Sequence, residues 1–114
     1  MKYVLLFVET ERYVRDLDAM DQAERDRAYE LAGKWFADNA GKINGGSKLQ
    51  PPHTATTVRL EGGGDPVVVD GPFVEGKEVV SGYTEVEADD LDEVLQMVKT
   101  WPGCPVVEIR PLAS

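Results

Sequence analysis

A carboxylate follows a predicted strand at the point where that strand must stop. The β-branched run Val67–Val69 favours a strand leading to Asp70, and Gly71 and Pro72 prevent the strand from continuing. An Asp in this position can accept hydrogen bonds from backbone N–H groups just ahead and so lock a turn. It can also be a polar group on a rigid rim, facing a ligand pocket capped by Phe73. Both interpretations stay open, and the second makes Asp70, Gly71, Pro72 and Phe73 candidate site residues.

His53 is the single histidine of the chain and follows two prolines. A lone histidine in such a place is commonly a solvated loop side chain. However, the alternating stretch 54–60, the glycine-rich loop 61–64 and the strand ending at Asp70 together predict a hairpin. His53 and Asp70 then lie at the same end of the hairpin, where the carboxylate could orient the imidazole for general acid or base catalysis.

Three further side chains are candidates for ligand contact. Arg59 and Lys77 could clamp an anion, although cations of this kind are more commonly solvated on the surface. Tyr83 lies on an alternating strand and presents either its hydroxyl to a ligand or its ring to the core.

The sequence predicts neither a metal site nor a cofactor. The acidic residues within 89–93 lie where a helix N-terminus favours acids, and they lack the spacing of a calcium loop. One His and one Cys cannot supply the usual ligands of zinc. Cys104 has no histidine near it in sequence, so a nucleophilic role is unsupported.

Charge and composition narrow the class of protein. The chain has 114 residues, which fits one domain, and its net charge of −9 disfavours nucleic acid and anionic membranes as partners. A single cysteine favours a reducing compartment. The apolar run after Met1 is too short for a signal peptide, and no stretch approaches the roughly 20 apolar residues of a membrane span. We therefore expect a cytoplasmic protein.

Hydrophobic periodicity predicts strands and helices in alternation. Asp18 or Asp21 is the predicted start of the first helix, and Gly41 its stop. In chain order, the predicted elements are a strand buried on both faces at 2–8, a polar connection at 9–17, a helix to about 40, a weak edge or bulged strand at 42–49, the hairpin, a strand at 79–86, a helix from Asp90 to Trp101 and a strand at 106–110.

This order is the α+β, ferredoxin-like βαββαβ plan with an extra hairpin arm. Right-handed crossovers place both helices on one face of an antiparallel sheet and leave the other face open. An open apolar face needs a partner, so we expect a homodimer. The residues expected on that face are Val58, Leu60, Val80 or Val86.

From Leu49 to Pro111 the chain resembles the DGPF branch of the YCII-related family. The resemblance rests on the stretches Leu-Gln-Pro-Pro, Thr-Ala-Thr-Thr-Val-Arg, Val-Val-Val-Asp-Gly-Pro-Phe-Val-Glu-Gly-Lys-Glu, Gly-Tyr, Glu-Ala-Asp-Asp-Leu-Asp-Glu-Val and Val-Glu-Ile-Arg-Pro. The opening Met-Lys-Tyr-Val-Leu-Leu and Gly45-Gly46 also fit, so the match covers most of the chain.

The resemblance implies a dimeric α/β barrel in a bacterial protein of uncharacterised activity. It also implies a His–Asp pair and lyase-type chemistry in some members, and extracytoplasmic-function sigma factors as companions of others. Many relatives carry a His in the first helix, roughly where this chain has Gly33, which leaves His53 as the substitute. Glycine inside a helix costs about 1 kcal/mol relative to alanine, which suggests that Gly33 serves close packing.

These observations predict binding of a small, partly apolar ligand with a carbonyl, phenol or carboxylate group. Its pocket is expected between sheet and helices, near Asp70, Phe73 and Tyr83. One hypothesis is a cofactor-free lyase or isomerase that uses acid–base residues. The other is a non-enzymatic, ligand-binding regulatory module that works with an extracytoplasmic-function sigma factor.

Overall fold

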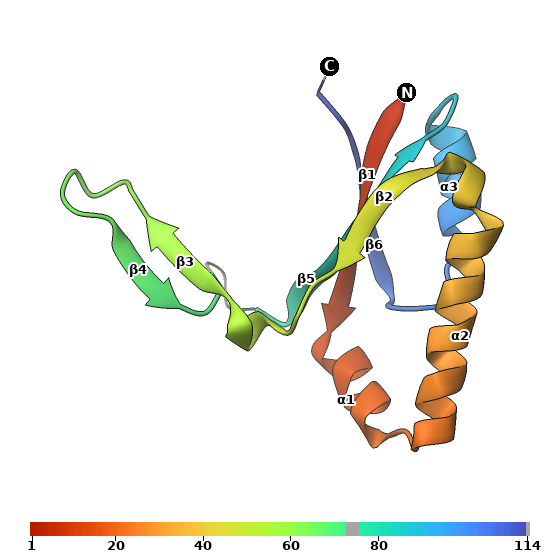
Figure 1. The fold of residues 1–114 in the computed structure, drawn as a ribbon, viewed down its shortest axis with the longest axis horizontal. Helices are drawn as coiled ribbons and strands as arrows, with labels where there is room; N and C mark the ends of the chain where they lie inside the picture. The colour runs from red at the N-terminus through yellow and green to blue at the C-terminus, as the bar shows by residue number, and fades with distance from the viewer. Residues whose placement is uncertain (73–75, 114) are drawn as a thin grey trace.

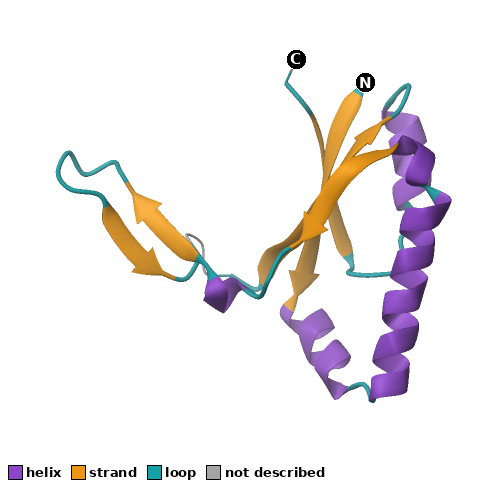
Figure 2. Ribbon diagram, in the orientation of Figure 1, coloured by secondary structure: helices purple, strands orange, loops and turns teal. Residues whose placement is uncertain are grey.

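The body of the protein is an antiparallel sheet with helices on one of its faces (Figures 1 and 2). The computed structural model describes residues 1–72 and 76–113. The four-stranded sheet has the order β2-β5-β1-β6, which is the ferredoxin-like topology predicted from the sequence. Its strands are β2 (Ile43–Lys48), β5 (Glu78–Glu87), β1 (Lys2–Thr10) and β6 (Val106–Pro111).

The core lies between this sheet and the helices. Tyr3, Leu5 and Phe7 alternate along β1 and are buried on the helix side. They pack with Trp35 of α2 (Gln22–Asp38) and with Val94 and Met97 of α3 (Leu91–Val98). β1 lies inside the sheet, as predicted. The prediction that both of its faces are buried was wrong for the single chain, because Val4, Leu6 and Val8 are only half-buried on the face that no helix covers.

Helix α1 (Glu11–Ala19) occupies most of the stretch that the sequence predicted to be a polar connection. Thr10 caps it, since the Thr10 hydroxyl accepts a hydrogen bond from the Tyr13 N–H at 3.1 Å. None of its residues is buried. The prediction failed because charged residues dominate this short segment, and its three large apolar residues, Tyr13, Val14 and Leu17, were read as part of a loop although they lie on one side of the helix.

The capping predictions for α2 and α3 are confirmed. The Asp21 carboxylate accepts from the Glu24 N–H at 2.8 Å, and the Asp90 carboxylate accepts from the Glu93 N–H at 2.9 Å. Backbone and Lys42 hydrogen bonds hold the pKa of the Glu93 carboxyl below its usual value. The C-terminal ends differ from prediction, because α2 ends at Asp38 before a 3₁₀ turn (Ala40–Lys42) and α3 ends at Val98.

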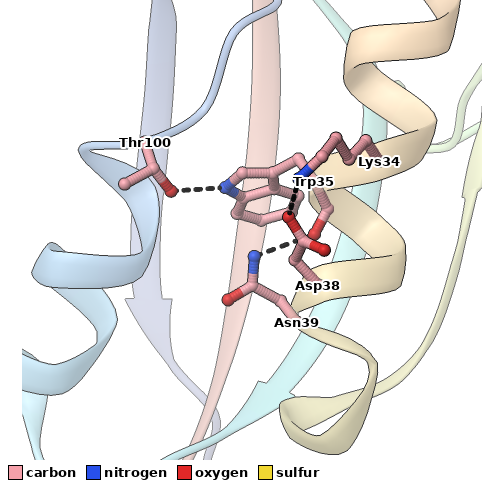
Figure 3. A network of polar contacts seen from close by, with 5 residues as sticks. All are labelled: Lys34, Trp35, Asp38, Asn39 and Thr100. Atoms are coloured by element: carbon pink, nitrogen blue, oxygen red, sulfur yellow. Dashed lines mark hydrogen bonds and ion pairs between the residues drawn. The ribbon is translucent and has the colours of Figure 1, made fainter.

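Trp35 joins α2 to α3 through polar as well as apolar contacts. Its indole N–H donates to the Thr100 hydroxyl at 3.0 Å (Figure 3) and to the Met97 carbonyl at 3.1 Å. On α2 itself, the Asn39 amide donates to the Trp35 carbonyl at 2.8 Å, and Lys34 pairs with Asp38 at 2.8 Å (Figure 3). Among residues 22–38, only Trp35 is buried.

The predicted hairpin forms an arm that projects from the body (Figure 1). It consists of β3 (Thr56–Arg59) and β4 (Val67–Asp70), and a 3₁₀ turn (Pro52–Thr54) precedes it. Its apolar side chains, including Val58, Val67, Val68 and Val69, are 49–63% exposed. These residues are unpartnered within the described part of the chain.

The sheet face opposite the helices is open, and Val80 lies on it as predicted, whereas Val58, Leu60 and Val86 do not. Val86 is fully buried on the helix side, and Val58 and Leu60 belong to the arm and its loop. Val80 pairs with Val8 on the open face, because a bulge between Phe7 and Val8 shifts the β1–β5 register by one residue. The open face therefore carries Val4, Leu6, Val8, Val80, Tyr83 and Val106.

Close packing does not explain Gly33, because a Cβ at this exposed position in α2 would meet no atom within 4 Å. Gly33→Ala should therefore raise the free energy of unfolding by about 0.5–1 kcal/mol, measured by urea denaturation. Gly46→Ala is the matched control and should destabilise, since Gly46 has φ 153° and a Cβ there would collide with the Tyr83 carbonyl. A destabilised Gly33→Ala variant would contradict this interpretation.

Candidate functional site

The structure places His53 and Asp70 at the same end of the arm, as predicted. His53 lies in the 3₁₀ turn before β3, and Asp70 is the last residue of β4, opposite Thr56. The Gly71 N–H donates to the Ala55 carbonyl at 2.7 Å, which closes this end of the hairpin. Both His53 and Asp70 are exposed, and no hydrogen bond between their side chains is present in the described structure.

The other predicted site residues are spread over the arm and the body. Arg59 lies at the far end of β3, where it pairs with Glu61 at 3.2 Å. The Lys77 carbonyl accepts from the Glu11 N–H at 3.1 Å, beside the start of α1. Tyr83 is on β5 and 44% exposed. Pro72 follows the arm, and Phe73 lies outside the described residues. The structure does not gather these residues around one cavity.

A cavity of about 610 Å³ lies between the sheet and the helices, which we call the sheet–helix cavity. Three aromatic rings line one part of its wall: Trp101 is centred 4.7 Å from Phe7 and 5.6 Å from Phe36. Small α2 side chains, Ala28 and Ala32, leave the space open. The wall also contains Tyr83 and the strand glycines Gly45, Gly46 and Gly82.

The polar groups of this cavity come from segments far apart in the sequence. Glu9, at the end of β1, has a side chain only 18% exposed, and Lys48 Nζ lies 3.8 Å from its carboxylate. Burial raises the pKa of the Tyr13 hydroxyl on α1, and the charges of Glu9, Cys104 and Tyr29 raise it further. Tyr13 therefore stays protonated at neutral pH.

Cys104 and Trp101 complete the wall at the loop between α3 and β6. Burial raises the pKa of the Cys104 thiol, and the Trp101 N–H beside it opposes this effect. That contact lacks hydrogen-bond geometry, so the buried indole nitrogen of Trp101 has no hydrogen-bond partner among the described residues. A buried N–H without a partner is uncommon in proteins. The indole nitrogen is enclosed beside Gly103 and Cys104, so the part of Trp101 that lines the cavity is its ring surface.

A second cavity, of about 630 Å³, lies beside α1 and next to the base of the arm. Its wall includes Lys77, Pro51 and Pro52, and it shares Glu9 and Lys48 with the sheet–helix cavity. The Glu9–Lys48 pair is therefore at the boundary of both cavities. Sequence reasoning missed Glu9 and Tyr13 because it treated their segment as a loop, whereas the cap at Thr10 turns Tyr13 toward the sheet end.

The sheet–helix cavity can support acid–base chemistry on a ring. A carboxylate accepts hydrogen bonds or a proton, a protonated phenol donates, and the aromatic wall packs against an apolar body.

Within residues 1–72 and 76–113, no group of three or more His, Cys, Asp or Glu side chains could hold a metal ion. None of the helices in these ranges is long and apolar enough to cross a membrane.

The YCII-related domain matches residues 1–112. The chain belongs to the YCII-related family. A relative from Rhizobium meliloti (strain 1021), the uncharacterized protein R00369, is 34% identical over 109 residues, which is 92% of this chain and 77% of the relative. The family resemblance drawn from the Asp-Gly-Pro-Phe segment and its flanks is thus confirmed.

A solved structure shares the YCII-related fold of this chain. It is 5-chloro-2-hydroxyhydroquinone dehydrochlorinase (TftG) from Burkholderia phenoliruptrix AC1100, in complex with 2,5-dihydroxybenzoquinone. The TM-score is 0.56 over 99% of this chain and 94% of the other, with 14% sequence identity. At that identity the likeness shows the fold alone.

Proposed function

We propose that this YCII-related protein binds a small ring-bearing molecule in the sheet–helix cavity. The observation that carries the proposal is the cavity itself: about 610 Å³, within the range of ligand sites, with Phe7, Phe36 and Trp101 on one wall and Glu9 and Tyr13 on another. The structural neighbour is a 5-chloro-2-hydroxyhydroquinone dehydrochlorinase in complex with 2,5-dihydroxybenzoquinone, and it supports the same ligand class.

We further propose that the reaction is a cofactor-free lyase or isomerase step. Such steps need a proton acceptor and a proton donor at the reacting ring, and the Glu9 carboxylate and the protonated Tyr13 hydroxyl are suited to these roles. Incubation with hydroquinones that carry a leaving group, followed by mass analysis of the products, tests this step. Unchanged substrates after prolonged incubation would contradict it.

His53 and Asp70 are the rival acid–base pair, and variants separate the two locations. Ala32→Phe should fill the cavity and weaken binding of 4-methylphenol at least tenfold, because the added ring occupies the ligand's space. His53→Ala should leave the affinity unchanged if the ligand lies in the cavity. Calorimetric titration measures both affinities, and the opposite pattern would favour the end of the arm.

The alternative function is a regulatory module that binds a ligand and an extracytoplasmic-function sigma factor. The exposed valines on both faces of the arm favour it, because apolar surface of this kind suits a protein partner. Ligand binding without turnover, together with sigma-factor binding that Val68→Lys abolishes, would support this alternative.

The open sheet face leads us to propose a homodimer, with the open faces of two copies packed together as in a dimeric α/β barrel. Half-exposed apolar side chains on the two strands that flank β1, which are Val80 and Tyr83 on β5 and Val106 on β6, support this arrangement.

A further inference from the structure

We propose that Glu9 anchors the ligand by accepting a hydrogen bond from a ring hydroxyl, so that the sheet–helix cavity selects neutral phenols over ring carboxylates. This inference rests on the proposed function, since it names the ligand class of the same cavity. The sequence predicted a ligand with a carbonyl, phenol or carboxylate group, and this inference selects the phenol and rejects the carboxylate.

The surroundings of Glu9 leave its carboxylate available to a ligand. Its side chain is mostly buried at 18% exposure, whereas the Lys48 side chain is 69% exposed and lies 3.8 Å away. An exposed, loosely paired lysine neutralises a carboxylate weakly. A carboxylate can accept about four hydrogen bonds. The Lys48 contact at 3.8 Å is longer than a hydrogen bond, and no hydrogen bond to the Glu9 carboxylate is present within the described residues.

The charges of the wall disfavour an anionic ligand. Among the described residues that line the cavity, Glu9 and Asp16 are negative and Lys48 is positive. Tyr13 remains a neutral hydroxyl that can donate a hydrogen bond. The whole chain carries a net charge of −9, which adds a field of the same sign. A ring carboxylate would therefore enter against repulsion, whereas a phenol hydroxyl would donate to Glu9.

The aromatic wall fixes the other end of the ligand. Phe7 and Trp101 are centred 4.7 Å apart and present ring surface to the cavity, which suits an apolar ring. A ligand with its ring against this aromatic wall and a hydroxyl at Glu9 is a substituted phenol or hydroquinone.

The test compares three matched probes by calorimetric titration: 4-methylphenol, 4-methylanisole, which cannot donate a hydrogen bond, and 4-methylbenzoate. The wild-type protein should bind 4-methylphenol about 10- to 100-fold more tightly than either of the others, the range expected for a hydrogen bond to a charged group. Glu9→Gln should weaken the binding of 4-methylphenol about tenfold and strengthen the binding of 4-methylbenzoate, because the amide carries no negative charge. Glu30→Gln, the same change at an exposed α2 residue paired with Arg27 at 3.4 Å, should alter neither affinity.

Equal affinity of the wild type for the phenol and the benzoate would overturn this inference alone. So would a Glu9→Gln variant with an unchanged ratio of the two affinities and an unchanged melting temperature. If none of the three probes binds to the wild type, the proposed function falls together with this inference.

Discussion

Trp35→Ala should lower the free energy of unfolding by about 3–5 kcal/mol, the range for removal of a large buried aromatic side chain. Trp35 is 5% exposed, and its ring contacts Phe7, Phe36 and Trp101 with centroids 5.1–6.4 Å apart. The change also removes the N–H that bonds to Thr100 and Met97. Because these contacts join α2 to α3 and the sheet, their loss affects the whole core.

Trp35→Phe separates the ring from its hydrogen bonds. It keeps most of the apolar contact and should cost less than Trp35→Ala. The lost N–H hydrogen bonds should contribute about 0.5–1.5 kcal/mol, because the Thr100 hydroxyl still donates to the Met97 carbonyl at 2.8 Å. Leu31→Ala, at a 37% exposed residue of the same helix, is the surface control and should cost less still. Urea denaturation measures all three variants. A cost below about 1 kcal/mol for Trp35→Ala would refute the central role of this residue.

A charge in the middle of the open sheet face should separate the proposed dimer. Leu6 lies on the central strand between Tyr83 and Glu108, so Leu6→Lys would place an ammonium group within the packed faces. Glu108 already pairs with Arg110 at 2.7 Å, so the packed faces supply no second carboxylate at Leu6 to neutralise the added ammonium. A buried charge left without its own partner costs about 3–5 kcal/mol, which corresponds to an increase in the dissociation constant of at least about 100-fold. Sedimentation velocity should show a dimer for the wild type and a monomer for Leu6→Lys at micromolar concentration.

The controls distinguish the open face from other apolar surfaces. Leu31→Lys, on the helix side, should leave the dimer intact, and circular dichroism should confirm that Leu6→Lys is folded. Val68→Lys tests whether the arm also contacts the second copy. A monomeric wild type at micromolar concentration would eliminate the dimer proposal.

The sequence predicted the fold well where the structure of a segment depends only on residues within that segment. Asp21 and Asp90 are caps because an Asp directly before the first residue of a helix accepts a hydrogen bond from a backbone N–H of the first turn. The arm was predictable because alternating strands and a glycine-rich loop specify a hairpin without distant contacts. Val80 was correctly predicted on the open face, whereas Val86 was wrongly predicted there. The one-residue bulge in the β1–β5 pairing places these two residues of β5 on opposite faces of the sheet.

The cavity could not be predicted, because no single segment contains it. Its wall combines the end of β1, one side of α1, the middle of α2 and the loop before β6. Tyr13 and Cys104 are 91 residues apart in sequence (104 − 13) and become neighbours only in the fold. Asp70 and His53 were conspicuous because they lie beside proline and glycine, which mark turns in any sequence.

The central claim is that the ligand lies in the sheet–helix cavity, and an NMR titration with 4-methylphenol tests it most directly. We expect the amide signals of the wall glycines Gly45, Gly46 and Gly82, and the indole N–H signal of Trp101, to shift as the ligand is added. The signals of His53 and of the arm residue Val68 should stay in place. Saturable shifts at His53 and Val68, with the glycine and Trp101 signals unmoved, would contradict the account.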